Sequence, residues 1–378
     1  MNWQPKRLDQ LGTVSRGRSR HRPRDAAHLY GGPHPFIQTG DVKHAGLYIN
    51  DYTQTYSDAG LAQSKLWPAG TLCITIAANI ADTAILDIDA CFPDSVIGFT
   101  PDPREADARF VKYLFDATIK RRAQQFSQGA TQDNLSQEKL LSLEFDVPKV
   151  DQQERIADIL STYDDLIENN RRRMALLEES ARLLYREWFV CLRFPGHEHT
   201  RAVDGVPEGW ERVPLEEALV LQRGFDLPTQ DRQEGTVPIY GSTGILGYHD
   251  KAKASAPGVV TGRSGTLGEV QYVAEDYWPL NTALWVKEFR RVTPLFALFL
   301  LREMDLKQYN GGASVPTLDR KSVHRVEVLI PSTLLLRSFD EFGADVFAQI
   351  KNLNTQNEKL RATRDLLLPR LMSGEITV

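Results

Sequence analysis

The sequence has few cysteines, no long apolar run and no strong excess of charge of either sign. Its three cysteines, Cys73, Cys91 and Cys191, are odd in number and widely spaced, so neither a disulfide framework nor a zinc site is indicated. No segment approaches the roughly 20 apolar residues that span a membrane, and the start MNWQPKRLDQLG lacks the apolar core of a signal peptide. We therefore expect a cytoplasmic protein without a membrane span.

A net charge of −5 over 378 residues argues against a wholly basic nucleic-acid-binding protein. The charge is unevenly distributed, however, because Lys6, Arg7 and five arginines between 16 and 24 precede residue 25 with only Asp9 to oppose them. A local basic patch on a mildly acidic chain is typical of a protein that binds nucleic acid on one face and proteins elsewhere.

Motifs for catalysis are also missing. The sequence contains no Asn-Pro-Pro-Tyr or Asp-Pro-Pro-Tyr segment of an amino-methyltransferase, no glycine-rich cofactor loop opening a helix after a strand, and no evident nuclease constellation. His197 and His199 lie in a segment rich in Pro and Gly and lack the further ligands that zinc requires. These absences favour a protein without an active site, metal or cofactor of its own.

The segment 151–190 contains neither Gly nor Pro and repeats apolar residues every seven positions on two series. This is the pattern of a coiled-coil seam, and Asp151 with Glu154 three residues on predicts an N-cap and capping box. The seam residues are Ile156, Leu160, Tyr163, Ile167, Asn170, Met174, Leu177 and Leu184.

The seam has a second copy 183 residues later in the chain. Its residues are Phe339, Val346, Ile350, Leu353, Asn357, Leu360 and Leu367. A lone seam helix needs a partner, so we expect the two copies to pair in antiparallel orientation. Asn170 and Asn357 would then meet near the middle, where they either hydrogen-bond and define the register or contact water.

The segments before each seam also repeat. GWERVPLEEALVLQRG (209–224) matches NWQPKRLDQLGTVSRG (2–17), so that Arg16 corresponds to Arg223 and Gly17 to Gly224. Further on, CFPDSVIGF (91–99) matches YWPLNTALW (277–285), and GATQDNL (129–135) matches GASVPTL (312–318). Alternating apolar segments broken by turns, together with a few helical ones, predict a mixed α/β domain in each half.

The predicted fold class is therefore α+β, with two similar mixed α/β domains joined by two long helices in an antiparallel coiled coil with a pseudo-two-fold repeat. The boundaries expected are 1–150 for the first domain, 151–190 for the central helix, 191–207 for a linker, 208–331 for the second domain, and 332–378 for the C-terminal helix and tail. A helix from Ile156 to Trp188 would be about 50 Å long. Two domains held that far apart suit DNA half-sites separated by about 34 Å, one helical turn.

With this organisation, the chain resembles the DNA specificity subunit of type I restriction–modification systems over essentially its whole length. The resemblance rests on PEGW (207–210), on the domain endings QGATQDNLSQEKLLSLEFDVP (128–148) and GGASVPTLDRKSVHRVEVLIP (311–331), on PIYGSTGILGYHD (238–250), and on LLLPRLMSGEI (366–376). The motifs are weak singly, but their order and duplication are specific.

The resemblance implies two target-recognition domains that each read half of a split sequence in double-stranded DNA. It also implies helices that dock two methyltransferase subunits, with restriction subunits joining the complex. S-adenosylmethionine, ATP and Mg would belong to those partner chains.

Several polar and basic residues are candidates for contact with DNA. Arg263 lies in the glycine-rich segment GRSGTLG (262–268) and suits a phosphate or a guanine edge, although a tight turn needed only for the fold is equally consistent with the pattern. Arg16 and Arg223 either contact phosphates symmetrically or brace each domain through a buried carboxylate. The full set is Arg16, Arg18, Arg20, Lys43, Asn79, Gln128, Thr131, Gln132, Arg223, Ser242, Thr243, Lys251, Arg263, Ser264 and Thr317.

An alternative remains a coiled-coil scaffold or adaptor protein that binds proteins and reads no bases.

Overall fold

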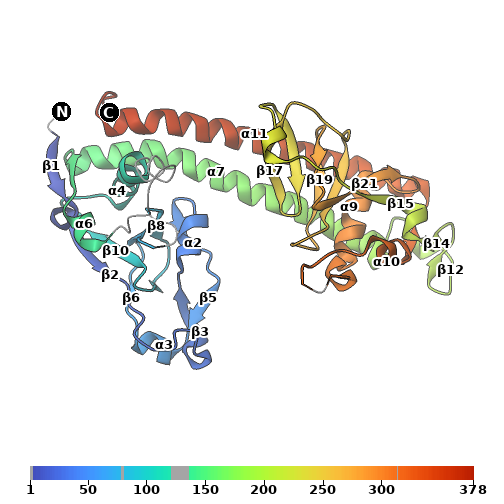
Figure 1. Ribbon diagram of the computed structural model, residues 1–378, viewed down its shortest axis with the longest axis horizontal. Coiled ribbons are helices and arrows are strands. Elements are labelled where there is room, and N and C mark those ends of the chain that lie inside the picture. Colours follow the sequence, from blue (N-terminus) through green and yellow to red (C-terminus); the bar gives the residue numbers. More distant parts are fainter. Residues whose placement is uncertain (1–2, 78–80, 121–135, 313) are drawn as a thin grey trace. The chain divides into compact units, whose positions relative to one another are not determined.

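The computed structural model describes residues 3–77, 81–120, 136–312 and 314–378 (Figure 1). It divides into two compact units, of which unit 1 comprises Met1–Arg171 with Thr355–Val378 and unit 2 comprises Arg172–Asn354. Each unit combines a mixed α/β domain with segments of the two long helices. The division between units thus cuts both helices, and the last residues of the chain belong to the same unit as the first.

The α/β domain of unit 1 contains two main sheets. In the larger sheet the order is β2-β10-β7-β8-β4, in the smaller it is β5-β3-β9-β6, and β1 pairs with β11. Its elements are β1 (Gln4–Arg7), α1 (Leu8–Leu11), β2 (Gly12–Arg16), η1 (Ala27–Leu29), β3 (Tyr30–Phe36), α2 (Thr39–His44), β4 (Tyr48–Ile49), β5 (Gln54–Tyr56), α3 (Asp58–Ala62), β6 (Leu66–Trp67), β7 (Leu72–Thr75), β8 (Thr83–Leu86), β9 (Ala90–Cys91), β10 (Val96–Pro101), α4 (Ala108–Phe115) with a π turn at Asp116–Lys120, α6 (Gln137–Leu141) and β11 (Glu144–Val147).

The α/β domain of unit 2 is built in the same way. Its sheets have the orders β15-β21-β18-β19 and β17-β16-β20, and β14 pairs with β22. Its elements are β14 (Glu211–Pro214), α8 (Leu215–Ala218), β15 (Leu219–Arg223), η5 (Thr229–Asp231), β16 (Val237–Gly241), β17 (Gly244–His249), β18 (Gly258–Gly262), β19 (Val270–Val273), β20 (Trp278–Pro279), β21 (Ala283–Phe289), α9 (Pro294–Glu303), η6 (Leu306–Tyr309), α10 (Arg320–His324) and β22 (Glu327–Ile330).

The repeat seen in the sequence is therefore a repeat of topology. β2, β10, β7 and β8 of unit 1 correspond in sheet order to β15, β21, β18 and β19 of unit 2. One part of the sequence match is wrong by a residue: Arg16 lies opposite Ile97, whereas Arg223 lies opposite Leu284. The offset of one residue extends to the preceding turn, because Phe92 O accepts from Arg18 N where Pro279 O accepts from Phe225 N, so Pro93 and Pro279 are not equivalent.

Two helices account for the predicted seams. α7 spans Val150–Tyr185 and continues into a π turn at Arg186–Val190, and α11 spans Thr333–Met372. The expected N-cap at Asp151 is wrong, because the helix begins one residue earlier and the amides of Gln152 and Gln153 both donate to the carbonyl of Lys149. The segment 191–207 contains a short 3-10 turn, His197–His199, and a small hairpin of β12 (Ala202–Val203) and β13 (Val206–Pro207).

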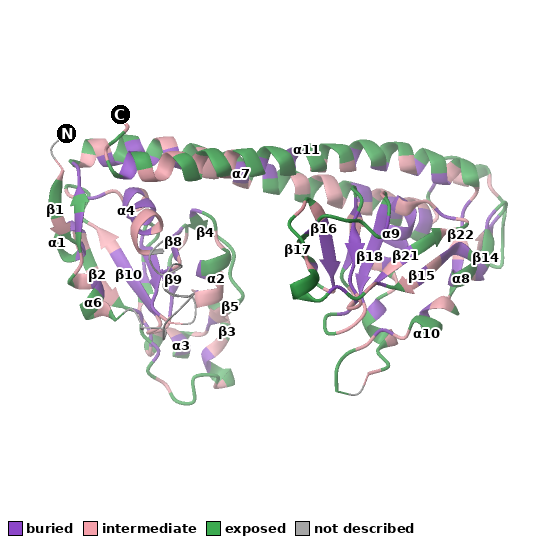
Figure 2. Ribbon diagram, turned by 45° about the horizontal axis from the view of Figure 1, so that its top comes forward, coloured by how far each residue is buried: buried purple, intermediate pink, exposed green. Residues whose placement is uncertain are grey.

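All the seam residues expected from the sequence are buried or half-buried. Figure 2 shows buried and half-buried positions recurring along α7 and α11. In unit 1, Asn170 Nδ2 donates to Asn357 Oδ1 at 2.9 Å, and Asn357 Nδ2 donates to the carbonyl of Ile167 at 3.3 Å. Asn170 and Asn357 are 6% and 1% exposed, so they meet each other rather than water. Their pairing gives this antiparallel helix pair a polar contact that specifies its register.

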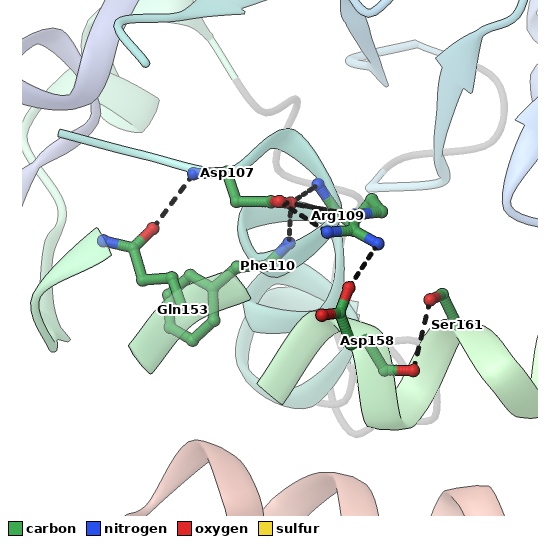
Figure 3. Close-up of polar contacts among 6 residues, drawn as sticks. All are labelled: Asp107, Arg109, Phe110, Gln153, Asp158 and Ser161. Atoms are coloured by element: carbon green, nitrogen blue, oxygen red, sulfur yellow. Dashed lines mark hydrogen bonds and ion pairs between the residues drawn. The ribbon is translucent and has the colours of Figure 1, made fainter. Parts of the chain in front are cut away.

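The domain of unit 1 is attached to α7 through a buried glutamine (Figure 3). Gln153 is fully buried, its Nε2 donates to the carbonyls of Glu105 and Pro148 at 2.9 Å each, and its Oε1 accepts from Asp107 N at 3.2 Å. Asp107 in turn caps α4, and Arg109 on that helix forms an ion pair with Asp158 of α7 at 2.8 Å. The first turns of α7 are therefore part of the domain's own hydrogen-bond network.

A second polar contact in unit 1 joins α4 to both long helices. Tyr113 Oη donates to Asp164 Oδ2 at 2.6 Å, and Arg364 of α11 pairs with the other carboxylate oxygen. Tyr113 is 1% exposed and the Asp164 side chain 10% exposed. Arg364 occupies a seam position, so this charge inside the interface is held by a partner on α7.

In unit 2 the helices meet the domain through an aromatic cluster. Tyr185 stacks on Phe299 of α9 at 5.7 Å between ring centroids, and Phe189 contacts Phe339 of α11 edge to face at 5.3 Å. Gly343 lies in the seam where a Cβ would fall 2.7 Å from Leu295 Cδ1, so its missing side chain makes room for α9. Within the described residues, no helix has an apolar stretch long enough to cross a membrane.

Candidate nucleic-acid interface

The two domains present the same arrangement where β2 and β15 end. In unit 1, Gly17 N donates to Val96 O at 2.8 Å and Arg18 N to Phe92 O at 3.0 Å. In unit 2, Gly224 N donates to Ala283 O at 3.1 Å and Phe225 N to Pro279 O at 2.8 Å. Arg16 and Arg223 therefore occupy equivalent strand ends, as the sequence match predicts.

Glycine is required at both strand ends by the close approach of a neighbouring segment. A Cβ on Gly17 would lie 2.3 Å from Pro93 O and 2.4 Å from Phe92 O, and one on Gly224 would lie 2.2 Å from Leu280 O and 2.5 Å from Pro279 O. Carbonyl groups held by backbone hydrogen bonds cannot withdraw. The glycine thus allows the neighbouring segment to approach where the strand ends, and the arginine before it is left exposed at that end.

Neither arginine is bound to a buried carboxylate. Arg16 is exposed and its Nε donates to the main-chain carbonyl of Asp94 at 3.1 Å. Arg223 lies 3.6 Å from Asp226, and their side chains are 52% and 70% exposed. Within the described residues, neither arginine braces its domain through a buried carboxylate. Both guanidinium groups remain accessible to a ligand, as contact with phosphates requires.

In unit 2, several candidate residues from distant parts of the sequence come together. Ser264 and Thr317 form an isolated β-bridge, and Leu318 N donates to Arg263 O at 2.8 Å. The Arg263 guanidinium is half-buried and donates to Asn281 O at 3.0 Å, so one of its hydrogen-bond donors is used within the domain. The glycine-rich turn is positioned by Gly265 and Gly268, whose φ values are +86° and +89°.

Ser242 and Thr243 form the two-residue turn between β16 and β17. This turn lies next to the same strand ends, because a Cβ on Gly262 would be 3.0 Å from Ser242 O and one on Gly241 would be 3.5 Å from Thr282 Oγ1. The hydroxyl of Thr282 is buried without a hydrogen-bond partner in the described chain. The ends of β15, β16 and β18 and the start of β21 therefore form one polar edge.

Two residues of this edge were missed by sequence reasoning. The Asn281 side-chain amide donates to Asp226, whose carboxylate also faces Arg223. Carboxylate and amide side chains suit the exocyclic amino groups of cytosine and adenine. In the sequence they could have been found only by position, because Asp226 follows the pair Arg223-Gly224 and Asn281 follows Pro279.

Lys251 is exposed and lies elsewhere in unit 2, at a surface cavity of about 490 Å³. The cavity is lined by Asp231, Gln233, His249, Lys251, Ala252, Lys253 and Trp278. In the described residues we find no hydrogen bond or ion pair that engages either lysine ammonium group. Lys253 instead lies 5.2 Å from the centre of the Trp278 ring.

The remaining candidates are in unit 1. Arg18 and Arg20 are exposed on the loop after β2, and Lys43 is exposed on α2. Asn79, Gln128, Thr131 and Gln132 lie outside the described residues. Over the part of the chain that the structure describes, no group of three or more His, Cys, Asp or Glu residues could hold a metal ion.

The strand that carries Arg223 is supported by a neutral histidine. Leu221 N donates to His324 Nε2 at 3.0 Å, so this nitrogen must be unprotonated. Burial lowers the pKa of His324, and the nearby charge of Arg320 lowers it further. The unfolded chain, in contrast, binds this proton near pH 6.5.

We therefore expect His324 to make unit 2 less stable in mild acid. Because the unfolded state binds the proton more tightly than the folded state, the stability from neutral His324 is complete above about pH 6.5. It falls as the pH drops through the lowered pKa, by at most about 1.4 kcal/mol per pH unit. Urea unfolding between pH 8 and pH 5 measures this slope.

The matched variant is His324→Gln, whose amide oxygen accepts the same hydrogen bond and does not titrate. The difference between the wild-type and variant slopes isolates His324 from Asp340, whose pKa is raised by burial. Equal slopes for both proteins would show that His324 does not couple folding to pH.

A duplicated α/β domain carried on two long helices, with an exposed Arg-Gly strand end in each copy, defines a class of two-domain coiled-coil proteins. Residues 1–179 match the family model described as the type I restriction modification DNA specificity domain. The chain is 23% identical over 412 residues to the type I restriction enzyme MjaIX specificity subunit of Methanocaldococcus jannaschii, covering 100% of this chain and 94% of that protein. It is 20% identical over 339 residues to the HindI specificity subunit of Haemophilus influenzae, covering 66% of this chain and 72% of that protein.

The fold is also similar to the crystal structure of a type I restriction–modification S subunit from M. genitalium. The TM-score is 0.59 at 18% sequence identity, over 98% of this chain and 96% of that chain. Residues 1–179 thus match the type I restriction modification DNA specificity domain, and the whole chain is similar in sequence to the specificity subunits of type I restriction enzymes.

Proposed function

We propose that this chain reads a split DNA sequence, one half-site for each α/β domain, and serves as the assembly platform for methyltransferase and restriction subunits. The observation that carries the proposal is the duplicated strand end, in which Arg16 and Arg223 occupy equivalent, accessible positions in two domains of the same topology. Two copies of one recognition domain on a single chain suit a target with two separate halves.

Support for the reading of bases comes from the composition of the polar edge in unit 2. It combines a guanidinium group, an amide and hydroxyls, which between them suit phosphates, purine edges and pyrimidine edges. A surface that only docked another protein would be expected to have an apolar centre. The polar edge therefore favours base reading over the scaffold alternative.

The long helices supply the surface for assembly. Outside the seam they expose large apolar side chains, which a chain without partners would leave in water. These residues, with their exposed fractions, are Leu166 (45%), Leu176 (70%), Leu183 (50%), Leu334 (74%) and Leu366 (71%). Methyltransferase subunits would cover them.

We further propose that the chain itself is not catalytic. On this proposal S-adenosylmethionine, ATP and Mg are bound by the partner subunits. In support, the sequence has no methyltransferase motif, and the described residues have no cluster of metal ligands.

The first test is to tag the chain in its native host and to determine which proteins co-purify and in what ratio. We expect two copies of an adenine methyltransferase for each chain, and a methylome in which the modified sites share a split sequence. Purification of the chain alone, or with unrelated proteins, would reject the platform role.

The second test uses Arg16→Ala and Arg223→Ala in the assembled complex. Each substitution should alter recognition of one half of the split sequence only, because each arginine belongs to one domain. If an arginine contacts a base, we expect a loss of about 1–3 kcal/mol confined to one base pair, measured by competition binding with single-base variants.

Arg212→Ala is a suitable control, since this exposed arginine lies on β14, which pairs with β22 rather than with the sheet that carries Arg223. It should leave recognition of both halves unchanged. If Arg16→Ala disturbed both halves equally, the assignment of one domain to one half-site would be wrong.

A further inference from the structure

Equivalent loops in the two domains have opposite charge. The loop after β2, residues 17–25, contains four arginines and one aspartate, whereas the loop after β15, residues 224–232, contains two aspartates and one arginine. Counting from the equivalent glycines, Arg18 corresponds to Phe225, Arg20 to Leu227 and Arg24 to Asp231. The two strand ends are alike, whereas the loops that follow them differ in sequence and charge.

The arginine loop is held in place by its backbone. Gln63 Oε1 accepts from Arg20 N at 2.6 Å and from His21 N at 3.0 Å, and Ser64 Oγ donates to Arg18 O at 2.7 Å. At the end of the loop, Tyr30 Oη donates to Arg24 O at 2.8 Å. None of these contacts uses an arginine side chain.

The side chains of the loop fall into two groups. The Arg22 guanidinium donates to the carbonyls of Ser19 and His21 at 2.8 Å each, and that of Arg24 pairs with Asp94 at 2.8 Å. Arg18 and Arg20 are exposed, and within the described residues neither guanidinium makes a hydrogen bond or an ion pair. Two cations are thus presented on an ordered backbone without an intramolecular partner.

A third cation lies beside them. Lys65 Nζ is 3.4 Å from the centre of the Trp67 ring and 3.5 Å from Ser15 Oγ. Burial lowers the pKa of Lys65, and the positive charge of Arg18 lowers it further. A bound anion would relieve the repulsion between the charges of Lys65 and Arg18.

The corresponding loop of unit 2 has no exposed arginine, because Arg232, its single arginine, is half-buried. Phe225 contacts Trp278 and Trp285, with ring centroids 6.4 Å and 6.2 Å apart, and Leu227 is buried. At the strand end the exposed Arg223 guanidinium lies 3.6 Å from the exposed carboxylate of Asp226. A phosphate at this position would compete with the Asp226 carboxylate for Arg223.

We propose that residues 17–25 form a phosphate clamp, in which Arg18 and Arg20 bind the DNA backbone beside the half-site read by the first domain, and that the loop after β15 makes no such contact. This inference rests on the proposed function. The electrostatic part of the affinity is then divided unequally between the half-sites. The first domain anchors the complex by charge, whereas the second relies more on contacts at its polar edge.

The test compares the assembled complex with its Arg18→Gln/Arg20→Gln variant on a duplex that carries the split target. Each phosphate contact contributes about −0.9 to the slope of log K against log salt, so the variant's slope should be shallower by about 2. Between 50 and 200 mM salt the wild type should therefore lose about 10-fold more affinity than the variant. Preferences for single bases should stay the same, because phosphate contacts carry no sequence information.

The control is Arg7→Gln/Arg104→Gln, which also removes two exposed cations of unit 1. These residues lie near the opposite end of the strands, since β2 begins opposite Pro101 and ends opposite Ile97. This variant should keep the wild-type slope. Replacing backbone phosphates with neutral methylphosphonates then locates the contact. The replacement should weaken DNA binding by the wild type in one half-site only, and should not weaken binding by the Arg18→Gln/Arg20→Gln variant.

An unchanged slope in that variant, or equal loss of methylphosphonate sensitivity in both half-sites, would overturn the phosphate clamp while leaving bipartite reading intact. If the wild-type complex did not prefer its target over a scrambled duplex, the proposed function itself would fail.

Discussion

Replacing Asp164 with alanine is expected to destabilise unit 1 by about 3 kcal/mol. The substitution removes the acceptor of the Tyr113 hydroxyl and the partner of the Arg364 guanidinium, two groups that come from α4 and α11. Removing one member of a buried ion pair is strongly destabilising, and Arg364 would keep only the more exposed Asp365 as a partner. The measurement is urea unfolding of the full chain, with hydrogen exchange in α4 as the local readout.

The adjacent Asp165→Ala provides a matched control. Asp165 is exposed on the same turn of α7, so its loss should change the free energy of unfolding by less than about 0.5 kcal/mol. Asp164→Asn should fall between the two, because the amide oxygen still accepts from Tyr113 but no longer neutralises Arg364. If Asp164→Ala proved as stable as Asp165→Ala, the contact among the three helices would not hold the domain to α7.

Adding one methyl group at Gly224 is expected to be almost as damaging, at about 3 kcal/mol. A Cβ there would lie 2.2 Å from Leu280 O, and both segments are joined by the hydrogen bonds of Gly224 N and Phe225 N, so neither can move alone. The strand end with Arg223 would be displaced. We expect Gly224→Ala to abolish recognition of one half-site, and Gly17→Ala that of the other.

Gly40→Ala tests whether the effect comes from the close approach rather than from glycine itself. Gly40 lies on α2, and no atom lies within 4 Å of the position of its Cβ. Alanine there should be neutral or stabilising by up to about 1 kcal/mol, since glycine is unfavourable in a helix. Thermal unfolding and half-site binding of the three variants, side by side, separate stability from recognition.

These two predictions concern features that the sequence indicated to different degrees. The Arg-Gly pairs were visible as a match between the halves, and their equivalence needed no coordinates. The contact of Asp164 with Arg364 was not visible, because an arginine at a seam position counts only as a break in an apolar series. Which carboxylate neutralises it depends on how the helices are rotated and on how α4 packs against them.

The residues of the candidate site also include some that the sequence indicated and some that only the structure revealed. Arg16, Arg223, Arg263 and Thr317 were identified because their residue types and turn motifs are local properties of the chain. Asp226 and Asn281, more than fifty residues apart, became candidates only when the end of β15 and the start of β21 were seen to converge. Sheet order places them together, and sheet order is a long-range property.

By itself the sequence determined the two-fold repetition, the seven-residue periodicity of the long helices, and the position of the asparagines at their centre. Each of these can be read from the order of residues along the chain, the repetition as a match between its halves and the heptads with their asparagines as a period of seven. The tertiary structure alone decided that 355–378 packs with the first domain, that the seam admits Gly343 to accommodate Leu295, and which arginines of the loop after β2 stay without partners. The physical reason is that burial and pairing are set by contacts between segments distant in the chain, and residue type does not specify those contacts until the fold brings them together.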